Sequence, residues 1–118
     1  YTKQKNENLT TYMFLINTEN AGELDVGIHF MENDVRIICQ ILRNNKCKPT
    51  IENLTTLNDL NDRCMLTRFT VSQGGLFATH DFKFSEYFLP DLVVKTMFRL
   101  VQNIDNYYDE IMRSLYAS

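Results

Sequence analysis

The sequence predicts an α+β fold in which one antiparallel β-sheet carries helices packed on one face. Three features support this prediction: alternating apolar residues before Thr50, a helix-spaced apolar stripe after it, and a glycine turn followed by a long amphipathic segment. The expected order of elements is β-β-β-α-β-β-α. Helices packed on one face of an antiparallel sheet are a stable layered arrangement for such an order.

Length and composition are those of one ordinary globular domain. The 118 residues, of which 44% are hydrophobic and 23% are charged, are enough to bury a sizeable core. We expect residues 9–118 to form a single α+β domain and the polar residues 1–8 to be disordered.

Charge and hydropathy argue against two classes of partner. A formal net charge of −3 does not favour binding to nucleic acid. No apolar run approaches the roughly 20 residues that a membrane-spanning helix needs, so we expect no membrane partner. The three cysteines, Cys39, Cys47 and Cys64, are odd in number and lack CxxC spacing, which favours a reducing, cytoplasmic compartment.

The first part of the chain predicts three strands in meander order. Residues 10–17 (TTYMFLIN) are aromatic and aliphatic enough for a strand, and residues 20–22 form its turn. Residues 24–31 and 35–42 alternate between apolar and polar positions on either side of a tight turn. The residues expected to face the core are Leu24, Val26, Ile28, Phe30, Val35, Ile37, Cys39 and Ile41.

The second part predicts a helix, a hairpin and a long helix. Residues 51–65 place apolar side chains at helical spacing, and Thr50 is the expected N-cap. Residues 66–84 contain two alternating segments joined at residues 73–75 (QGG), which is typical of a β-hairpin. The closing helix is opened by a proline, which suits the first helical turn. Its core-facing residues are expected to be Val93, Met97, Leu100, Ile104, Tyr107 and Ile111.

The segment LNDLNDRCMLTRFTVSQGGLFATHDFKF carries a family resemblance. It is similar to the YbjN-type pattern of a helix ending in an Asn, a short strand, a glycine turn and a second strand. The whole order of elements resembles the fold shared by YbjN-like proteins and the type III secretion chaperones, best over residues 57–115 and more loosely over residues 24–42. The resemblance implies a small acidic dimeric domain that binds a partner polypeptide and performs no chemistry.

The chain departs from that family at its start. Those families open with an amphipathic helix, whereas this chain has a polar segment followed by a strand. A competing likeness is the RWD-type α+β module of kinetochore and ubiquitin-pathway proteins, which also ends in a long helix. The RWD module is less similar in the middle helix and second hairpin, and its sheet has a different strand order.

Residues that could carry chemistry do not form a recognisable active site. By alternation His29 and His80 face opposite sides of the sheet, so we expect no shared metal or catalytic site. Cys47 lies between two lysines that could lower the pKa of its thiol, but no histidine is near in sequence to act as a base. We therefore expect no enzyme activity, no metal and no cofactor.

The candidate site is the face of the sheet opposite the predicted core. Alternation places apolar side chains on this face, where polar ones are usual, and neighbouring exposed apolar residues mark interaction sites. The residues of this expected patch are Met13, Leu15, Met31, Ile38, Leu42 and Phe77. Three occupants could cover it: an N-terminal helix of the same chain, a second copy, or a partner peptide that docks by strand addition or in a groove.

These observations favour a non-enzymatic partner-binding domain, chaperone-like or regulator-like and homodimeric, that buries a polypeptide or a second subunit on the sheet. Two alternatives remain open. One is an RWD-like interaction module of a larger eukaryotic assembly. The other is a small ligand-binding domain or enzyme, which would require an apolar pocket with His80 or Cys47 at its wall.

Overall fold

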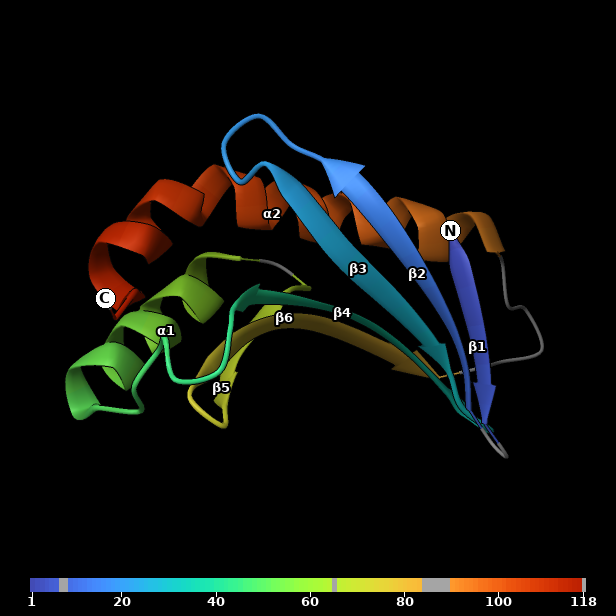
Figure 1. The fold of residues 1–118 in the computed structure, drawn as a ribbon, viewed down its shortest axis with the longest axis horizontal. Helices are drawn as coiled ribbons and strands as arrows, with labels where there is room; N and C mark the ends of the chain where they lie inside the picture. Colours follow the sequence, from blue (N-terminus) through green and yellow to red (C-terminus); the bar gives the residue numbers. More distant parts are fainter. Residues whose placement is uncertain (7–8, 65, 84–89, 118) are drawn as a thin grey trace.

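The computed structural model describes residues 1–6, 9–64, 66–83 and 90–117, and they form an α+β domain (Figure 1). The elements in chain order are β1 (Thr2–Asn6), β2 (Leu9–Asn17), β3 (Glu23–Phe30), β4 (Asp34–Leu42), α1 (Ile51–Arg63), β5 (Arg68–Ser72), β6 (Gly75–Lys83) and α2 (Pro90–Leu115). From β2 onward this order agrees with the prediction, and the α+β class is confirmed.

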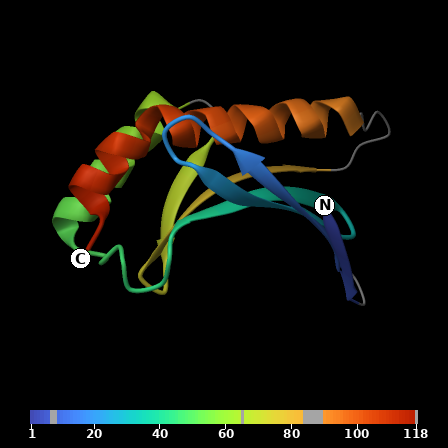
Figure 2. The ribbon, with the colours of Figure 1, turned by 45° about the horizontal axis from the view of Figure 1, so that its top comes forward.

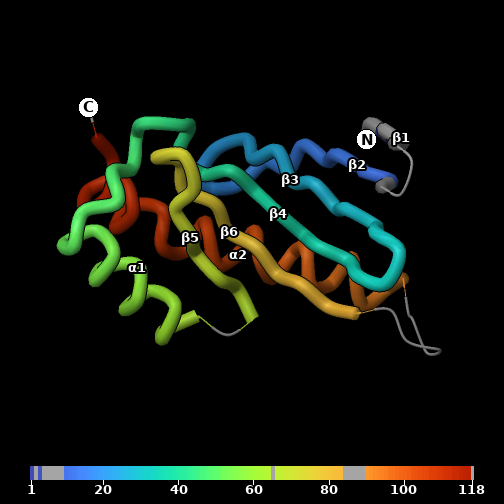
Figure 3. The backbone as a smooth tube through the Cα atoms, turned by 90° about the horizontal axis from the view of Figure 1, so that it is seen from below, coloured from blue at the N-terminus to red at the C-terminus, as the bar shows by residue number. Residues whose placement is uncertain are grey.

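The strands form one antiparallel sheet in the spatial order β1-β2-β3-β4-β6-β5. The first four strands follow one another as neighbours. The chain then crosses through α1 to β5 at the far edge, and β6 returns between β4 and β5. Figure 2 shows α2 lying along one face of the curved sheet, and the opposite face is turned toward the viewer in Figure 3. We call the face covered by α2 the inner face and the opposite one the outer face.

The polar N-terminal residues differ from the prediction. Residues 1–8 were expected to be disordered, but Thr2–Asn6 form strand β1, which pairs with Leu9–Met13 of β2 as an edge strand; residues 7 and 8 lie outside the described residues. The segment TKQKN has no apolar alternation that would predict a strand. Polar and lysine-rich sequences are nevertheless common at sheet edges, where they oppose pairing with other chains.

The hydrophobic core lies between α2 and the inner face. The strand residues predicted to face it are buried at Leu24, Val26, Ile28, Val35, Ile37 and Cys39, while Phe30 and Ile41 are partly buried. On α2 the predicted stripe is confirmed: Val93, Met97, Leu100, Ile104 and Ile111 are buried, and Tyr107 is half-buried. Helix α1 contributes Leu57 and Leu60 at one end of the sheet, next to β5 and α2 (Figure 3).

Polar contacts at the ends of α1 fix its position. Thr50 caps the helix as predicted, because its hydroxyl accepts a hydrogen bond of 3.1 Å from the backbone N–H of Asn53. Near the other end, the side-chain amide of Asn61 accepts from the backbone N–H of Phe69 at 2.6 Å and donates to its carbonyl at 3.0 Å. Asn61 therefore holds the edge strand β5 as a neighbouring strand would.

The β5–β6 turn requires a left-handed backbone at two positions. Gln73 has φ of 54° and Gly74 has φ of 71°, the pattern of a two-residue hairpin turn. A Cβ on Gly74 would lie 2.9 Å from the backbone nitrogen of Asn45, which is too close for any side chain. Gly22 has the same φ of 71° but has no heavy atom within 4 Å of the position of a Cβ.

We therefore expect Gly74→Ala to lower the free energy of unfolding by at least about 2 kcal/mol, because it adds a backbone clash to left-handed strain. Gly22→Ala is the matched control, with an expected loss of about 1 kcal/mol from the strain alone. Urea denaturation of both variants measures the difference. Equal losses would show that the contact with Asn45 does not constrain the turn.

Candidate partner-binding face

Three of the six predicted residues come together on the outer face. Met13 of β2, Ile38 of β4 and Phe77 of β6 are half-buried. Strands β4 and β6 are neighbours, and Gly27 of β3 lies between Met13 and Ile38. The register pairs Met13 with Gly27 and Gly27 with Ile38, and Phe77 is diagonal to Ile38 because it pairs with Gln40. We call Met13, Ile38 and Phe77 the outer apolar patch.

Leu42 lies in the core, so its prediction as an outer-face residue is wrong. Its side chain is only 4% exposed, and it pairs with Leu76. The pairing of β4 with β6 shifts register between Gln40 and Leu42, so β4 accommodates one extra residue there as a β-bulge. The bulge reverses the alternation, which turns Leu42 inward and leaves Ile41 only partly buried.

The two remaining residues flank the patch. Leu15 is 64% exposed on β2, opposite Asp25, and is the most accessible of the predicted apolar side chains. Met31 is half-buried just beyond the end of β3, where its backbone N–H donates to the carbonyl of Asp34 at 2.8 Å. It is four residues from Gly27, a separation of about 13 Å along a strand, so it does not extend the patch directly.

The side chains of Met13, Ile38 and His29 close over Gly27 at the centre of the patch, because β3 has no side chain there. The position that a Cβ of Gly27 would occupy is 3.1 Å from Met13 Sδ, 3.5 Å from Ile38 Cγ2 and 3.5 Å from His29 Nε2. Gly27 is therefore buried, and it forms part of the floor of a cleft of about 560 Å³ that also has Gln40, Phe77 and Asp25 in its wall. Glycine within a strand often marks a place where another molecule approaches the backbone closely.

The cleft continues toward α2 where β3 and β4 separate. The paired residues of these strands end at Val26 and Cys39, and beyond them Leu24, Ile41 and Tyr108 of α2 line the cleft. Sequence reasoning did not find this opening or the role of Gly27. A glycine in an otherwise alternating strand was the one signal that could have indicated it.

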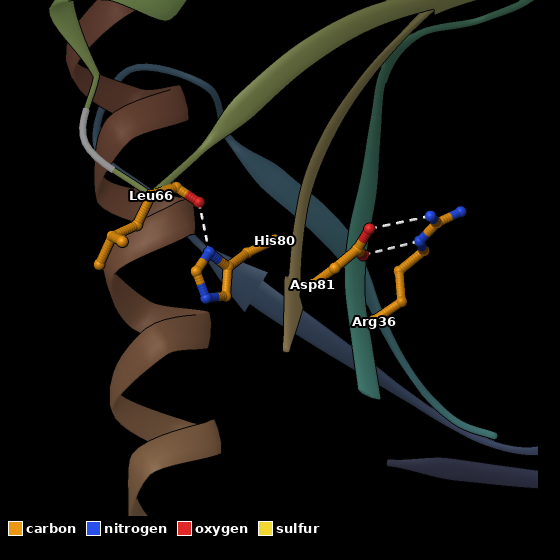
Figure 4. A network of polar contacts seen from close by, with 4 residues as sticks. All are labelled: Arg36, Leu66, His80 and Asp81. Atoms are coloured by element: carbon orange, nitrogen blue, oxygen red, sulfur yellow. Dashed lines mark hydrogen bonds and ion pairs between the residues drawn. The ribbon is translucent and has the colours of Figure 1, made fainter. Parts of the chain in front are cut away.

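A polar row borders the patch on one side. Arg36 donates to both carboxylate oxygens of Asp81, at 2.7 and 2.9 Å, and this hydrogen bonding lowers the pKa of Asp81 (Figure 4). The two side chains are about half exposed, at 47% and 50%, so the pair contributes little stability on its own. It presents both signs of charge next to an apolar surface.

His29 belongs to the same row and is more constrained than a surface histidine. Its Nδ1 lies 2.9 Å from the hydroxyl of Thr11, which is buried. Partial burial, and then the nearby cation of Arg36, lower the pKa of His29. The neutral imidazole is therefore the form that this face favours.

The other residues that could carry chemistry are Cys39, Cys47 and His80. Cys47 is fully buried, and burial raises the pKa of its thiol, so its two lysine neighbours do not make it a reactive cysteine. Burial likewise raises the pKa of Cys39 to about 12. His80 contacts the carbonyl of Leu66 through Nδ1 (Figure 4) and lines a mainly polar cavity with Asn61 and Arg68.

Neither the protein-family models nor the curated proteins that we searched match this chain. Within the part of the chain that the structure describes, no helix is long and apolar enough to cross a membrane. The same residues contain no group of three or more His, Cys, Asp or Glu side chains that could hold a metal ion. The functional proposal therefore depends on the geometry of the outer face.

Because the pKa of His29 is lowered in the folded protein, we expect the stability of the fold to decrease toward acidic pH. Because the unfolded chain binds a proton more readily than the folded protein, stability is full above the unfolded pKa of about 6.5 and decreases as the pH falls below it. We expect the urea midpoint of the wild type to fall more between about pH 7.5 and about pH 5.5 than that of His29→Gln. Parallel pH profiles of the two proteins would contradict this account of His29.

Proposed function

We propose that this protein is a non-enzymatic partner-binding domain that buries a second copy of itself or another polypeptide against the outer apolar patch. The observation that carries the proposal is the cleft on the face away from α2, which has apolar walls from Met13, Ile38 and Phe77. A side chain inserted there would be desolvated on several sides, which is the setting of most interface hot spots.

The surroundings of the patch support a second copy as the first partner to test. A two-fold interface brings the same surface of each subunit together, so that surface must be self-complementary. Arg36 and Asp81 provide a cation and an anion side by side next to the patch, each about half exposed. Two copies related by a two-fold axis could exchange these partners around an apolar centre.

From β2 to α2 the elements follow the order β-β-β-α-β-β-α, and the sheet places β6 between β4 and β5. The family resemblance rests on this order of elements along the chain, so we keep a YbjN-like or secretion-chaperone-like domain as the first proposal and an RWD-like module as the second. The resemblance implies a partner-binding, chaperone-like role, and the outer face is the surface that we propose for it.

We expect Ile38→Glu and Phe77→Glu to convert a wild-type dimer to monomer, because each buries a carboxylate in the apolar centre of the interface. Light scattering behind a sizing column, at several concentrations, measures the mass. Leu54→Glu adds the same charge to the exposed face of α1 and should leave the mass unchanged. An unchanged mass for both patch variants, or a wild type that is monomeric at every concentration, would contradict self-association through this face.

Gly27→Ala tests the floor of the cleft without adding charge. Gly27 is not among the residues with positive φ, and its new methyl group would meet the flexible thioether of Met13, so we expect the fold to be retained with little change in stability. The displaced Met13 side chain should narrow the cleft and weaken association by about tenfold or more, equivalent to about 1.4 kcal/mol. Sedimentation equilibrium of the variant and the wild type gives this ratio, and equal dissociation constants would show that the cleft is not used.

A further inference from the structure

A second cavity lies on the inner face, between the first three strands and the start of α2. Its volume is about 510 Å³, which is within the usual range for small-molecule sites. Its described lining is Lys3, Thr10, Tyr12, Phe14, Ile28, Phe30, Pro90, Val93 and Val94. This lining contains neither His80 nor Cys47, so the cavity is not the pocket that the alternative of a small ligand-binding domain or enzyme requires.

Aromatic rings form the strand side of this inner cavity. Tyr12 meets Phe30 edge to face, with ring centroids 5.8 Å apart. Tyr1 packs over Tyr12 and Phe14, with centroid distances of 5.7 and 5.8 Å. The rings hold one another in place and present a broad apolar surface to the first turns of α2.

One charged side chain stands among the described lining residues. Lys3 is exposed, and its ammonium group lies 5.6 Å from the centroid of the Tyr12 ring. Thr10 and Tyr12 contribute hydroxyl groups to the same lining. A ligand with one negative charge at the end of an apolar body would match this distribution.

The backbone at the strand side of the cavity has no capacity to bind a peptide main chain. Thr10 and Tyr12 pair with β1 on one side and with β3 on the other, and Ile28 pairs with both β2 and β4. A peptide would have to bind there through its side chains, because each of its own N–H and C=O groups that is buried without a partner costs about 1–3 kcal/mol. A hydrocarbon chain has no such groups.

We propose that the inner cavity binds a single-chain, monoanionic amphiphile of the fatty-acid type. The hydrocarbon chain lies among Tyr12, Phe14 and Val93, and the carboxylate pairs with the ammonium group of Lys3. The site is on the opposite face of the sheet from the outer apolar patch, so it does not depend on the proposed function.

The test is a calorimetric titration of the full chain with dodecanoate below its micelle concentration. We expect saturable binding to one site. Val94→Glu places a charge at the cavity wall and should weaken binding by about tenfold or more. Leu92→Glu is the matched control: it lies on the same helical turn, 54% exposed against 45% for Val94, but is not part of the lining, and should change affinity less than about twofold.

The contribution of Lys3 is tested with a neutral ligand of the same length. Lys3→Gln should weaken the binding of dodecanoate about three- to fivefold, as expected for loss of an exposed ion pair. The same substitution should leave the affinity for 1-dodecanol unchanged. Circular dichroism of each variant checks that the fold is kept. Absence of dodecanoate binding to the wild type, or equal effects of Val94→Glu and Leu92→Glu, would overturn the proposal.

Discussion

The packing of α2 along the inner face is the interaction on which the rest of the structure depends. Leu100, Ile104 and Ile111 are almost completely buried, and burial of each such side chain contributes about 1.5–3 kcal/mol. The helix also provides several polar contacts that fix distant connections. Asp105 accepts hydrogen bonds of 2.7 and 2.9 Å from the backbone N–H groups of Asn20 and Ala21, which anchors the β2–β3 turn.

Other segments are attached to the same helix. Asn103 donates to the buried hydroxyl of Thr67 before β5 at 2.8 Å, and Glu110 pairs with Arg63 at the end of α1 at 2.6 Å. Just beyond α2, the backbone N–H of Ala117 donates to the carbonyl of Lys46 at 2.7 Å. Helix α2 and the residues just beyond it therefore fix the β2–β3 turn, the start of β5 and the end of α1 relative to one another.

Hydrophobic periodicity predicted the inner face well, because one side of each central strand is buried and a shift of one residue would expose its whole apolar set. Periodicity failed at positions where burial of one face does not determine the register of the strand. Strand β1 is a polar edge whose register comes from its neighbour, so its sequence carries no alternation. Ile41 and Leu42 are both apolar, so a period-two pattern could not show which of them the bulge turns inward.

The candidate site on the outer face could likewise be predicted only in part from the sequence. Met13, Ile38 and Phe77 were found because each interrupts a polar face, whereas the close approach of Met13 to Ile38 across β3 depends on the absence of a side chain at Gly27. The edges of the sheet help to explain why a face, and not an edge, is the proposed contact. Asn61 occupies the backbone groups of Phe69 on β5, and β1 carries the lysines that oppose edge pairing.

The bond between Asp105 and the β2–β3 turn has a consequence for biosynthesis. The residues it joins are 85 positions apart, so the turn cannot be anchored until Asp105 of α2 has left the ribosome. Until then the first strands carry an apolar face without its covering helix, a state that is prone to aggregation. Emergence of α2, and not formation of the early hairpins, is therefore the step that allows the inner face to be covered.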